Sequence, residues 1–245
     1  MAPMNIIPNK NLFIVTSALK PNMGVINDAD RYTQTIDTLK NLRERCPDDY
    51  IFFTDGSPNQ VEQEKLDEIS KYVDVSVCWS QHPDIFALAS SGRKSESEVV
   101  LLFHTLALLK TNVDLMKMLQ SVQRIFKYSA RSSLHDSFDI KEYDNLFDDN
   151  LFGKYVFKKA IPSWLPPEKK RQITDHLYIT RMYSFCPSLL DDYIGSLQSI
   201  YNTVVTTGVD TEHAHYKEID ANLVIAKETL HCDGIIAGTG KVEQY

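Results

Sequence analysis

The sequence predicts an α/β fold, a single domain over residues 1–245 in which helices flank a mainly parallel central sheet. Short apolar runs rich in β-branched and aromatic residues alternate with stretches that repeat apolar residues at helical spacing. Such alternation favours parallel strands joined by right-handed crossovers. The 245 residues suffice for one sizeable core, and no internal repeat or low-complexity linker divides them.

The first half contains three predicted strands, each followed by a helix. The strands are residues 11–19, 50–54 and 73–79, and residues 55–58 form a turn after the second. Ile36, Leu39 and Leu42 have helical spacing, which predicts a helix over 28–45. Further helices are expected over 60–72 and 92–110, and Thr111 or Asn112 is the expected cap of another that ends near residue 120.

The second half opens with a predicted strand at 124–131. An irregular acidic and aromatic stretch at 141–153 follows, then strands at 154–160 and 177–185. A helix is expected over 187–201, and Asp210 is the expected N-cap of the next one. Ligands of sheets of this kind bind beyond the carboxyl ends of the strands, which is where candidate site residues are sought.

Composition limits the classes of protein that this chain could belong to. Hydrophobic residues make up 43% and charged residues 24%, as in an ordinary globular protein. No run reaches the eighteen or so apolar residues that cross a bilayer, and the N-terminus lacks a signal peptide's apolar core. The four cysteines lie far apart, without a Cys-x-x-Cys pair, so free thiols are expected. We therefore expect a cytoplasmic protein without membrane association.

Polar residues follow the first two strands at the edge where a ligand would bind. Thr16 and Ser17 end the first strand, Arg31 lies at the start of the following helix, and Asp55 follows the second strand. A carboxylate at a strand end can accept hydrogen bonds from a base or a ribose. The alternative is that Asp55 only stabilises the turn 55–58 through local hydrogen bonds, since aspartate is common in turns.

Cations mark the strand at 124–131. Lys127, Ser129 and Arg131 share one face of it, because side chains of a strand alternate with a period of two. Positioned cations can stabilise the charge of a phosphate group, and arginine can do so through two hydrogen bonds. Arg181, on the later strand, is a further candidate. The alternative is that each of these cations pairs with a surface carboxylate.

The densest cluster of acid–base groups lies at 210–217. Glu212 and His215 are neighbours on a helix, three residues apart, and Asp210 is at its cap. Either carboxylate could act as a general base, and Glu212 is the first choice. A His-x-His pair suits one metal ion better on a strand than on a helix, so His213 and His215 predict no metal site. The alternative is an ordinary capped helix with a polar face.

A basic and aromatic segment spans 154–171. Lys158, Lys159 and Trp164 are its candidate ligand-binding residues, because cations can grip a polyanion while a ring stacks on a base. The formal net charge of −7 argues against broad, non-specific nucleic-acid binding, but it allows a local basic face. A solvated loop is the alternative.

Taken in order, these fragments resemble the small glycosyltransferases of the GT-A type, which have a Rossmann-like nucleotide-sugar domain. The likeness is to phage and large-DNA-virus members, among them phage hydroxymethylcytosine DNA glucosyl- and arabinosyltransferases. It rests on 13–19, 31–39, 50–57, 126–131 and 208–213, and so covers nearly the whole chain with degenerate motifs. A Gly-x-x-x-x-Gly-Lys-Ser/Thr loop and a Gly-x-Ser-x-Gly elbow are both absent from the sequence.

The resemblance implies transfer of a sugar from a nucleotide diphosphate to an acceptor hydroxyl. Residues 1–125 would be the nucleotide-binding half and 126–245 the acceptor and catalytic half. The donor would contact the following residues: Thr16, Ser17, Arg31, Asp55, Lys127, Arg131, Arg181 and His215. Lys158, Lys159 and Trp164 would contact the acceptor, and Glu212 or Asp210 would be the base.

The chain departs from this family where an Asp-x-Asp pair usually holds a divalent metal, because Lys127-x-Ser129-x-Arg131 stands there. We therefore expect no required cofactor, with a divalent metal as the alternative. Duplex DNA carrying 5-hydroxymethylcytosine is the preferred acceptor, in the host cytoplasm if a phage encodes the enzyme. A saccharide or lipid-linked acceptor, or a binding module without catalysis, are the alternatives, and the oligomeric state stays open.

Overall fold

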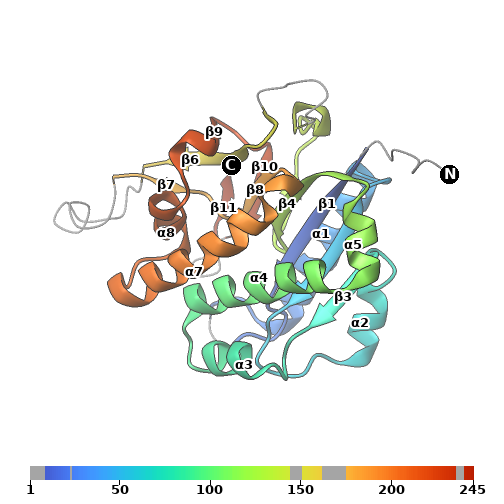
Figure 1. Ribbon diagram of the computed structural model, residues 1–245. Helices are drawn as coiled ribbons and strands as arrows, with labels where there is room; N and C mark the ends of the chain where they lie inside the picture. The colour runs from blue at the N-terminus through green and yellow to red at the C-terminus, as the bar shows by residue number, and fades with distance from the viewer. Residues whose placement is uncertain (1–8, 23, 144–150, 162–174, 236–239) are drawn as a thin grey trace.

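The computed structural model describes residues 9–22, 24–143, 151–161, 175–235 and 240–245. Helices cover both faces of a central sheet, which gives three layers (Figure 1). The sheet has eight strands in the described part of the chain, and a second sheet of three short strands lies beside it. The predicted α/β architecture with a mainly parallel sheet is confirmed.

The parallel part of the sheet comes from the first half of the chain. Its strands stand in the order β3-β2-β1-β4, with β1 at Lys10–Ser17, β2 at Tyr50–Asp55, β3 at Val75–Cys78 and β4 at Val122–Ser129. Each neighbouring pair is parallel, and β1 is paired on both sides. Such strands are buried on both faces and read as continuous apolar runs, which is why they were recognisable in the sequence.

The second half extends the sheet with antiparallel pairs. Next to β4 come β8 at Met182–Phe185, β6 at Tyr155–Ala160 and β7 at Leu177–Tyr178, and β9 at Val224–Lys227 pairs with β6 in parallel. The small sheet has the order β11-β10-β5, from Val242–Gln244, Cys232–Ile235 and Ser132–Leu134. Short 3₁₀ turns are η1 at Ile140–Tyr143, η3 at Pro187–Leu189 and η4 at Ala221–Leu223.

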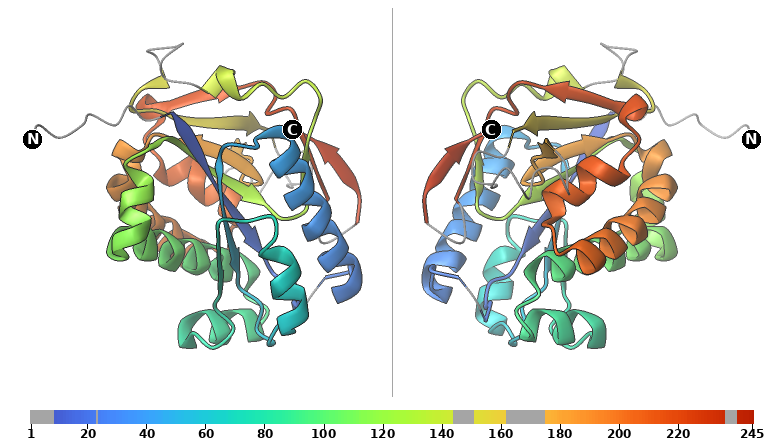
Figure 2. Two further views of the ribbon diagram at one scale, coloured as in Figure 1. Left: turned by 90° about the vertical axis from the view of Figure 1, so that its right-hand side faces the viewer. Right: turned by 90° about the vertical axis from the view of Figure 1, so that its left-hand side faces the viewer.

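The helices divide between the two faces, as Figure 2 shows. One face carries α1 at Asp28–Arg45 and α2 at Gln63–Ile69; the other carries α4 at Lys94–Thr111, α5 at Val113–Leu119 and α7 at Leu190–Thr207. Phe13 and Val15 of β1 belong to the core under α1, whereas Leu12 and Ile14 belong to the core under α4. Alternate residues of one strand thus anchor both helical layers.

Several elements differ from the prediction, which did not include the strands β5, β9, β10 and β11. Residues 177–185 form β7 and β8 with a break between them, because backbone groups there serve β4: the Thr180 carbonyl accepts a hydrogen bond from Lys127 Nζ, and the Arg181 carbonyl accepts one from Ser129 N. A short helix that was not predicted, α3 at Pro83–Ser90, packs on α4 and buries Ile85 and Leu88.

Other elements match the prediction closely. Helix α1 has the predicted bounds, and Asn112 caps α5 by accepting hydrogen bonds from the amides of Asp114 and Leu115. Asp210 caps α8, at Thr211–Glu218, through the amide of His213. The four cysteines are free thiols.

Among the described residues, no single helix is long and apolar enough to cross a bilayer. Helices α4 and α5 meet the length and composition test only together, as a pair bent by 91°. In this fold Leu102 and Leu106 of α4 are part of the core against the sheet.

Candidate functional site

A cavity of about 310 Å³ opens beyond the carboxyl ends of β1, β2 and β4. Helix α1 and the start of α4 complete its walls, so residues from both predicted halves of the chain line it. The polar side chains at its surface are Thr16, Ser17, Asn22, Arg31, Thr35, Lys94, Ser97, Glu98, Lys127, Ser129 and Arg131. This is the edge at which open α/β sheets bind ligands.

The end of β1 supplies the floor of the cavity. Thr16 and Ser17 both line it, as predicted, and the Thr16 hydroxyl donates a long hydrogen bond of 3.4 Å to the Tyr128 carbonyl. Ala18 and Gly56 also line the cavity. An added Cβ at Gly56 would meet the Leu101 side chain at 3.0 Å, so this wall is closely packed.

Asp55 supports this floor from below instead of facing the cavity. Its side chain is fully buried and accepts hydrogen bonds from Leu19 N at 2.8 Å and Ser57 N at 3.0 Å. Both carboxylate oxygens are therefore occupied by backbone amides of the two loops. The direct donor contact predicted for Asp55 is therefore corrected: Asp55 stabilises the turn, as in the alternative given above. The negative charge of Asp55 also favours the charged form of Arg31.

Three arginines converge on one side of the cavity. Arg31 is 6% exposed, and its guanidinium donates to the carbonyls of Ile26 and Ala18. Arg131 and Arg181 each donate to the Ile235 carbonyl, at 3.1 and 3.0 Å, so their guanidinium groups lie side by side. Burial, followed by repulsion from Arg181 and Arg31, lowers the pKa of Arg131 to about 10.

Arg181 packs against Tyr245 and Gly234, although it does not itself line the cavity. Its guanidinium lies over the ring of Tyr245, 5.5 Å from the centroid. Gly234 allows this approach, because an added Cβ would lie 2.8 Å from Arg181 Cδ and 2.9 Å from Tyr245 Cε2. The small sheet thus positions Arg181 next to Arg131.

Helix α4 adds two charged side chains that the sequence prediction did not include. Glu98 accepts a hydrogen bond from Lys127 Nζ at 2.7 Å, and the same ammonium donates to the Thr180 carbonyl. Burial alone would raise the pKa of Glu98, but Lys127 and Lys94 bring it down to about 2. Lys94 lines the cavity, and desolvation together with the neighbouring Arg131 and Arg181 lowers its pKa.

Two carboxylates of α8 have opposite pKa shifts. The pKa of Glu212 is raised to about 7, chiefly by burial and next by the charge of Asp210, while Arg181 opposes both effects. Burial would raise the pKa of Asp210 as well, but hydrogen bonds from the His213 ring and amide bring it below its usual range. Carboxylates whose pKa values are pushed apart in this way are typical of acid–base pairs.

Glu212 lies beside the cavity and not in its lining. Its charge influences the pKa of Lys94, which does line the cavity. Its carboxylate accepts a hydrogen bond from the Thr180 amide, in the break between β7 and β8. The same break brings Arg181 and the Thr180 carbonyl to the cluster.

His215 belongs to the core and not to a donor site. It is 3% exposed, its Nδ1 lies 2.7 Å from the Thr211 carbonyl, and its Nε2 lies 2.9 Å from the Tyr193 hydroxyl. Burial lowers its pKa to about 4, which keeps the ring neutral. Because both ring nitrogens have partners within the protein, the predicted donor contact is corrected to a structural one.

The carboxyl end of β4 does not offer the ligands that a divalent metal needs. Lys127, Ser129 and Arg131 face the cavity there, as predicted. Among the described lining residues the one carboxylate is that of Glu98, and Lys127 neutralises it. Hard cations prefer several oxygen ligands, so these residues fit an anion and do not fit a metal held against a diphosphate.

The predicted acceptor residues are not brought together. Lys158 and Lys159 are successive residues of β6 and point to opposite faces of the strand. Lys158 influences the pKa of Cys232, whereas the Lys159 ammonium lies 5.1 Å from the centre of the Tyr216 ring. Trp164 lies outside the described residues.

No protein-family model matches this sequence, and no curated protein matches it. The structure is similar to the galactosyltransferase LgtC solved with donor and acceptor sugar analogs: TM-score 0.51, 11% identity, 88% of this chain and 72% of that one. It is also similar to the mannosyltransferase Ktr4p from S. cerevisiae: TM-score 0.50, 10% identity, 87% of this chain and 66% of that one.

A glycosyltransferase involved in glycosylation of the PBCV-1 major capsid gives a TM-score of 0.45 at 8% identity, over 89% of this chain and 81% of that one. At such identities the likenesses show the fold alone. The chain has the α/β fold, with a mixed, mostly parallel sheet, of the GT-A glycosyltransferase structures, and the predicted fold class is confirmed.

Proposed function

We propose that this protein is a glycosyltransferase that moves a sugar from a nucleotide-diphosphate carrier to an acceptor hydroxyl. The observation that carries this proposal is the pair of guanidinium groups of Arg131 and Arg181, held side by side on the Ile235 carbonyl. Within the described residues neither forms an ion pair with a carboxylate, although the two repel each other. A bound dianion would relieve that repulsion.

The positions of the cations suggest how the donor would be oriented in the proposed complex. The diphosphate lies at the cationic side, near Arg131 and Lys94, and the nucleoside extends toward Thr16 and Ser17 at the end of β1. Helix α4 begins at Lys94, so its first amides add a positive partial charge on that side. This arrangement matches the strand-end position at which open α/β sheets bind nucleotides.

Breakage of the glycosidic bond leaves negative charge on the departing diphosphate. Arg131 and Lys94, which line the cavity, stabilise that charge directly, and Arg181 beside Arg131 adds to the positive field. A divalent metal plays this part in other enzymes of this fold. Cations fixed in place before the reaction stabilise such charge without reorganisation. No step of this mechanism passes through a metal, in keeping with the poor metal site at the end of β4.

Glu212 is the proposed base. Its pKa of about 7 suits a group that must be ionised before the reaction and must then accept a proton from the acceptor hydroxyl. Asp210, with its lowered pKa, would remain ionised and raise the basicity of Glu212. Direct attack by the deprotonated hydroxyl would invert the anomeric centre, which product NMR can determine.

Calorimetric titration with a panel of nucleotide-diphosphate sugars tests the donor site. Replacing Arg131 by Gln removes charge-assisted hydrogen bonds worth about 1.5–3 kcal/mol, so the donor Kd should rise about 10- to 150-fold. Arg45→Gln is the matched control, since Arg45 pairs with Asp136 at the far end of α1. Absence of binding for every donor, with or without Mn²⁺, would overturn the proposal.

Duplex DNA carrying 5-hydroxymethylcytosine is the proposed acceptor, and the exposed cation Lys159 is the observation that supports it. Lys159 is solvent-accessible on the strand β6, beside the aromatic ring of Tyr216. Lys159→Glu should weaken transfer to DNA and reduce its salt dependence, and should leave transfer to a saccharide unchanged. Equal effects on both acceptors would refute the DNA assignment.

A binding module without catalysis predicts a different pattern from the same experiments. It would bind the donor with the same dependence on Arg131, but mass analysis would find no sugar on DNA or on saccharide acceptors. Turnover that disappears in Glu212→Gln, while donor affinity is kept, would decide for the enzyme.

A further inference from the structure

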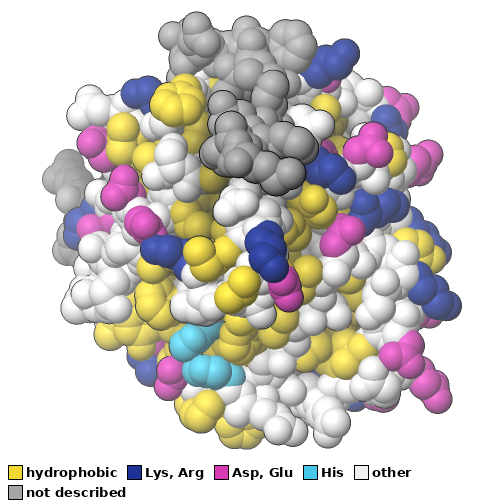
Figure 3. Space-filling view, turned by 45° about the vertical axis from the view of Figure 1, so that its right-hand side comes forward, with side chains coloured by type: hydrophobic (Ala, Val, Ile, Leu, Met, Phe, Trp, Pro, Cys, Tyr) yellow, Lys and Arg dark blue, Asp and Glu magenta, His cyan; other side chains and the backbone are white. Residues whose placement is uncertain are grey.

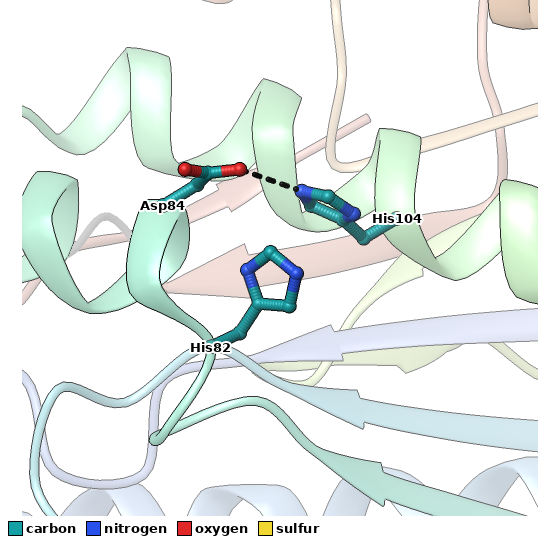
Figure 4. A group of neighbouring side chains, drawn as sticks. All are labelled: His82, Asp84 and His104. Carbon is teal, nitrogen blue, oxygen red and sulfur yellow. Dashed lines mark ion pairs between the residues drawn. The ribbon is translucent and has the colours of Figure 1, made fainter.

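Three potential metal ligands meet on the α3–α4 side of the molecule, outside the donor cavity. His82 is the residue before α3, Asp84 lies in the first turn of α3, and His104 lies in the middle of α4. One ligand atom from each lies within 4.8 Å of the others. Figure 4 shows the three side chains gathered between the two helices, and Figure 3 shows histidine side chains at the surface among hydrophobic ones.

The distances suit a small cation better than a direct ion pair. His104 Nε2 and Asp84 Oδ2 are 3.5 Å apart, which is long for a hydrogen bond. Tetrahedral bonds of about 2.0–2.1 Å to one ion would place neighbouring ligand atoms roughly 3.3–3.4 Å apart. The third ligand needs to move by an ångström or so, a shift within the reach of side-chain rotation.

The imidazole of His82 provides a second observation. Its Nδ1 is buried and has no hydrogen-bond partner among the described residues. A buried polar atom without a partner is energetically costly. A hydrogen-bond donor or a cation would supply the missing partner of this nitrogen. The rings of His82 and His104 are 4.0 Å apart, with Trp79 beside both of them.

The group of three side chains is open to solvent on one side. Asp84 and His104 also border a second cavity, of about 390 Å³, and the Asp84 side chain is 67% exposed, so an ion has a path in and a water molecule can complete its coordination.

We propose that His82, Asp84 and His104 form a binding site for a divalent transition metal of the zinc class. Two imidazoles, one carboxylate and a solvent-facing position are a common donor set for zinc. The ion would fasten the eight-residue helix α3 to α4. Because Ala89 and Gly92, at the end of α3, line the donor cavity, it would also steady one wall of that cavity.

Equilibrium dialysis against Zn²⁺, followed by metal analysis of the washed protein, tests the site without any nucleotide sugar. Wild type should retain one equivalent, and Co²⁺ in its place should give the visible absorption of a tetrahedral site. At a hundredfold excess over Kd, Zn²⁺ should raise the Tm by about 5 °C or more. Hydrogen exchange of 83–92 should slow at the same time.

Variants separate this site from adventitious binding. His82→Ala, His104→Ala and Asp84→Asn should each lose the stoichiometric metal, and Asp84→Asn keeps the test valid if a histidine variant misfolds, because its side chain is exposed. His135→Ala is the matched control: His135 forms a 2.7 Å pair with Asp233 and should keep the metal bound. Wild type without a retained equivalent, or an Asp84→Asn variant that binds like wild type, would overturn the site and leave the donor-site proposal untouched.

Discussion

Replacing Glu212 by Gln should abolish transfer and at the same time stabilise the folded protein at alkaline pH. The reason is the pKa of Glu212, which the fold raises from the ordinary 4.5 to about 7, chiefly by burial. Between these values the folded state holds a proton that the unfolded chain has released, so folding stability falls as pH rises. Above pH 7 the carboxylate is ionised in both states and the whole penalty remains.

The size of the effect follows from the shift. From 4.5 to about 7 is roughly 2.5 pKa units, and at 1.36 kcal/mol per unit this gives about 3 kcal/mol as an upper value. The Gln side chain keeps an oxygen that can accept the hydrogen bond from the Thr180 amide, so little else is lost. We expect the variant to gain about 2–3 kcal/mol over wild type near pH 8, and close to nothing near pH 4.

Urea denaturation of wild type and variant at both pH values measures this difference. The m-value should be unchanged, so that the midpoint alone reports stability. Asp210→Asn is the matched control of opposite sign, because the fold lowers the pKa of Asp210 and its charge is stabilising above its ordinary pKa. A Glu212→Gln variant that is no more stable at pH 8 than at pH 4, relative to wild type, would refute the pKa assignment.

Three further predictions concern the surroundings of the donor site. Gly234→Ala should weaken donor binding about tenfold or more in calorimetry by displacing Arg181, whereas Gly195→Ala, which meets nothing within 4 Å, should leave it unchanged. Asp55→Ala should cost about 2–5 kcal/mol in urea denaturation, because two buried amides lose their acceptor; Asp55→Asn should cost less. Turnover should persist in excess EDTA. If EDTA abolished turnover in wild type and in the zinc-site variant Asp84→Asn alike, a metal would take part in the reaction.

The fold could be predicted because its physical signals are local. Buried parallel strands read as apolar runs, and α1 shows both its helical spacing and an acidic first turn. Helix α3 was not predicted, since it is only eight residues long and buries few side chains, Ile85 and Leu88. Its one local signal was Pro83, a residue that is favoured in the first turn of a helix.

The candidate site was only partly predictable, because its members meet through tertiary contacts. Lys127 and Arg131 follow from the period of one strand. Lys94 and Glu98 were not singled out, although a cation at the start of a helix is unfavourable and can indicate a bound anion. Asp55 and His215 were assigned by residue type, which does not reveal whether the protein itself already occupies their polar atoms.

The proposed metal site could not be predicted from the sequence for the same reason. His82 and Asp84 are close in sequence, but His104 lies on another helix, and no ligand spacing in the sequence links it to them. The expectation of no metal rested on the His-x-His pair at 213–215 and on the missing Asp-x-Asp pair, and both observations concern other places in the chain. Only the packing of α3 on α4 brings the three side chains together.

Donor binding should itself strengthen the proposed base. Arg181 lowers the pKa of Glu212 in the free protein, and a diphosphate bound at Arg131, next to Arg181, would offset that influence with its own negative charge. The pKa seen in the pH profile of kcat, which reports the complex, should therefore lie above the pKa of about 7 expected in the profile of kcat/KM for the donor. In Arg181→Gln the pKa values from the kcat and kcat/KM profiles should differ less than in wild type, because the cation that couples donor and base is gone. Profiles with equal pKa values in wild type would show that Glu212 does not sense the diphosphate, and the base would then have to be sought elsewhere.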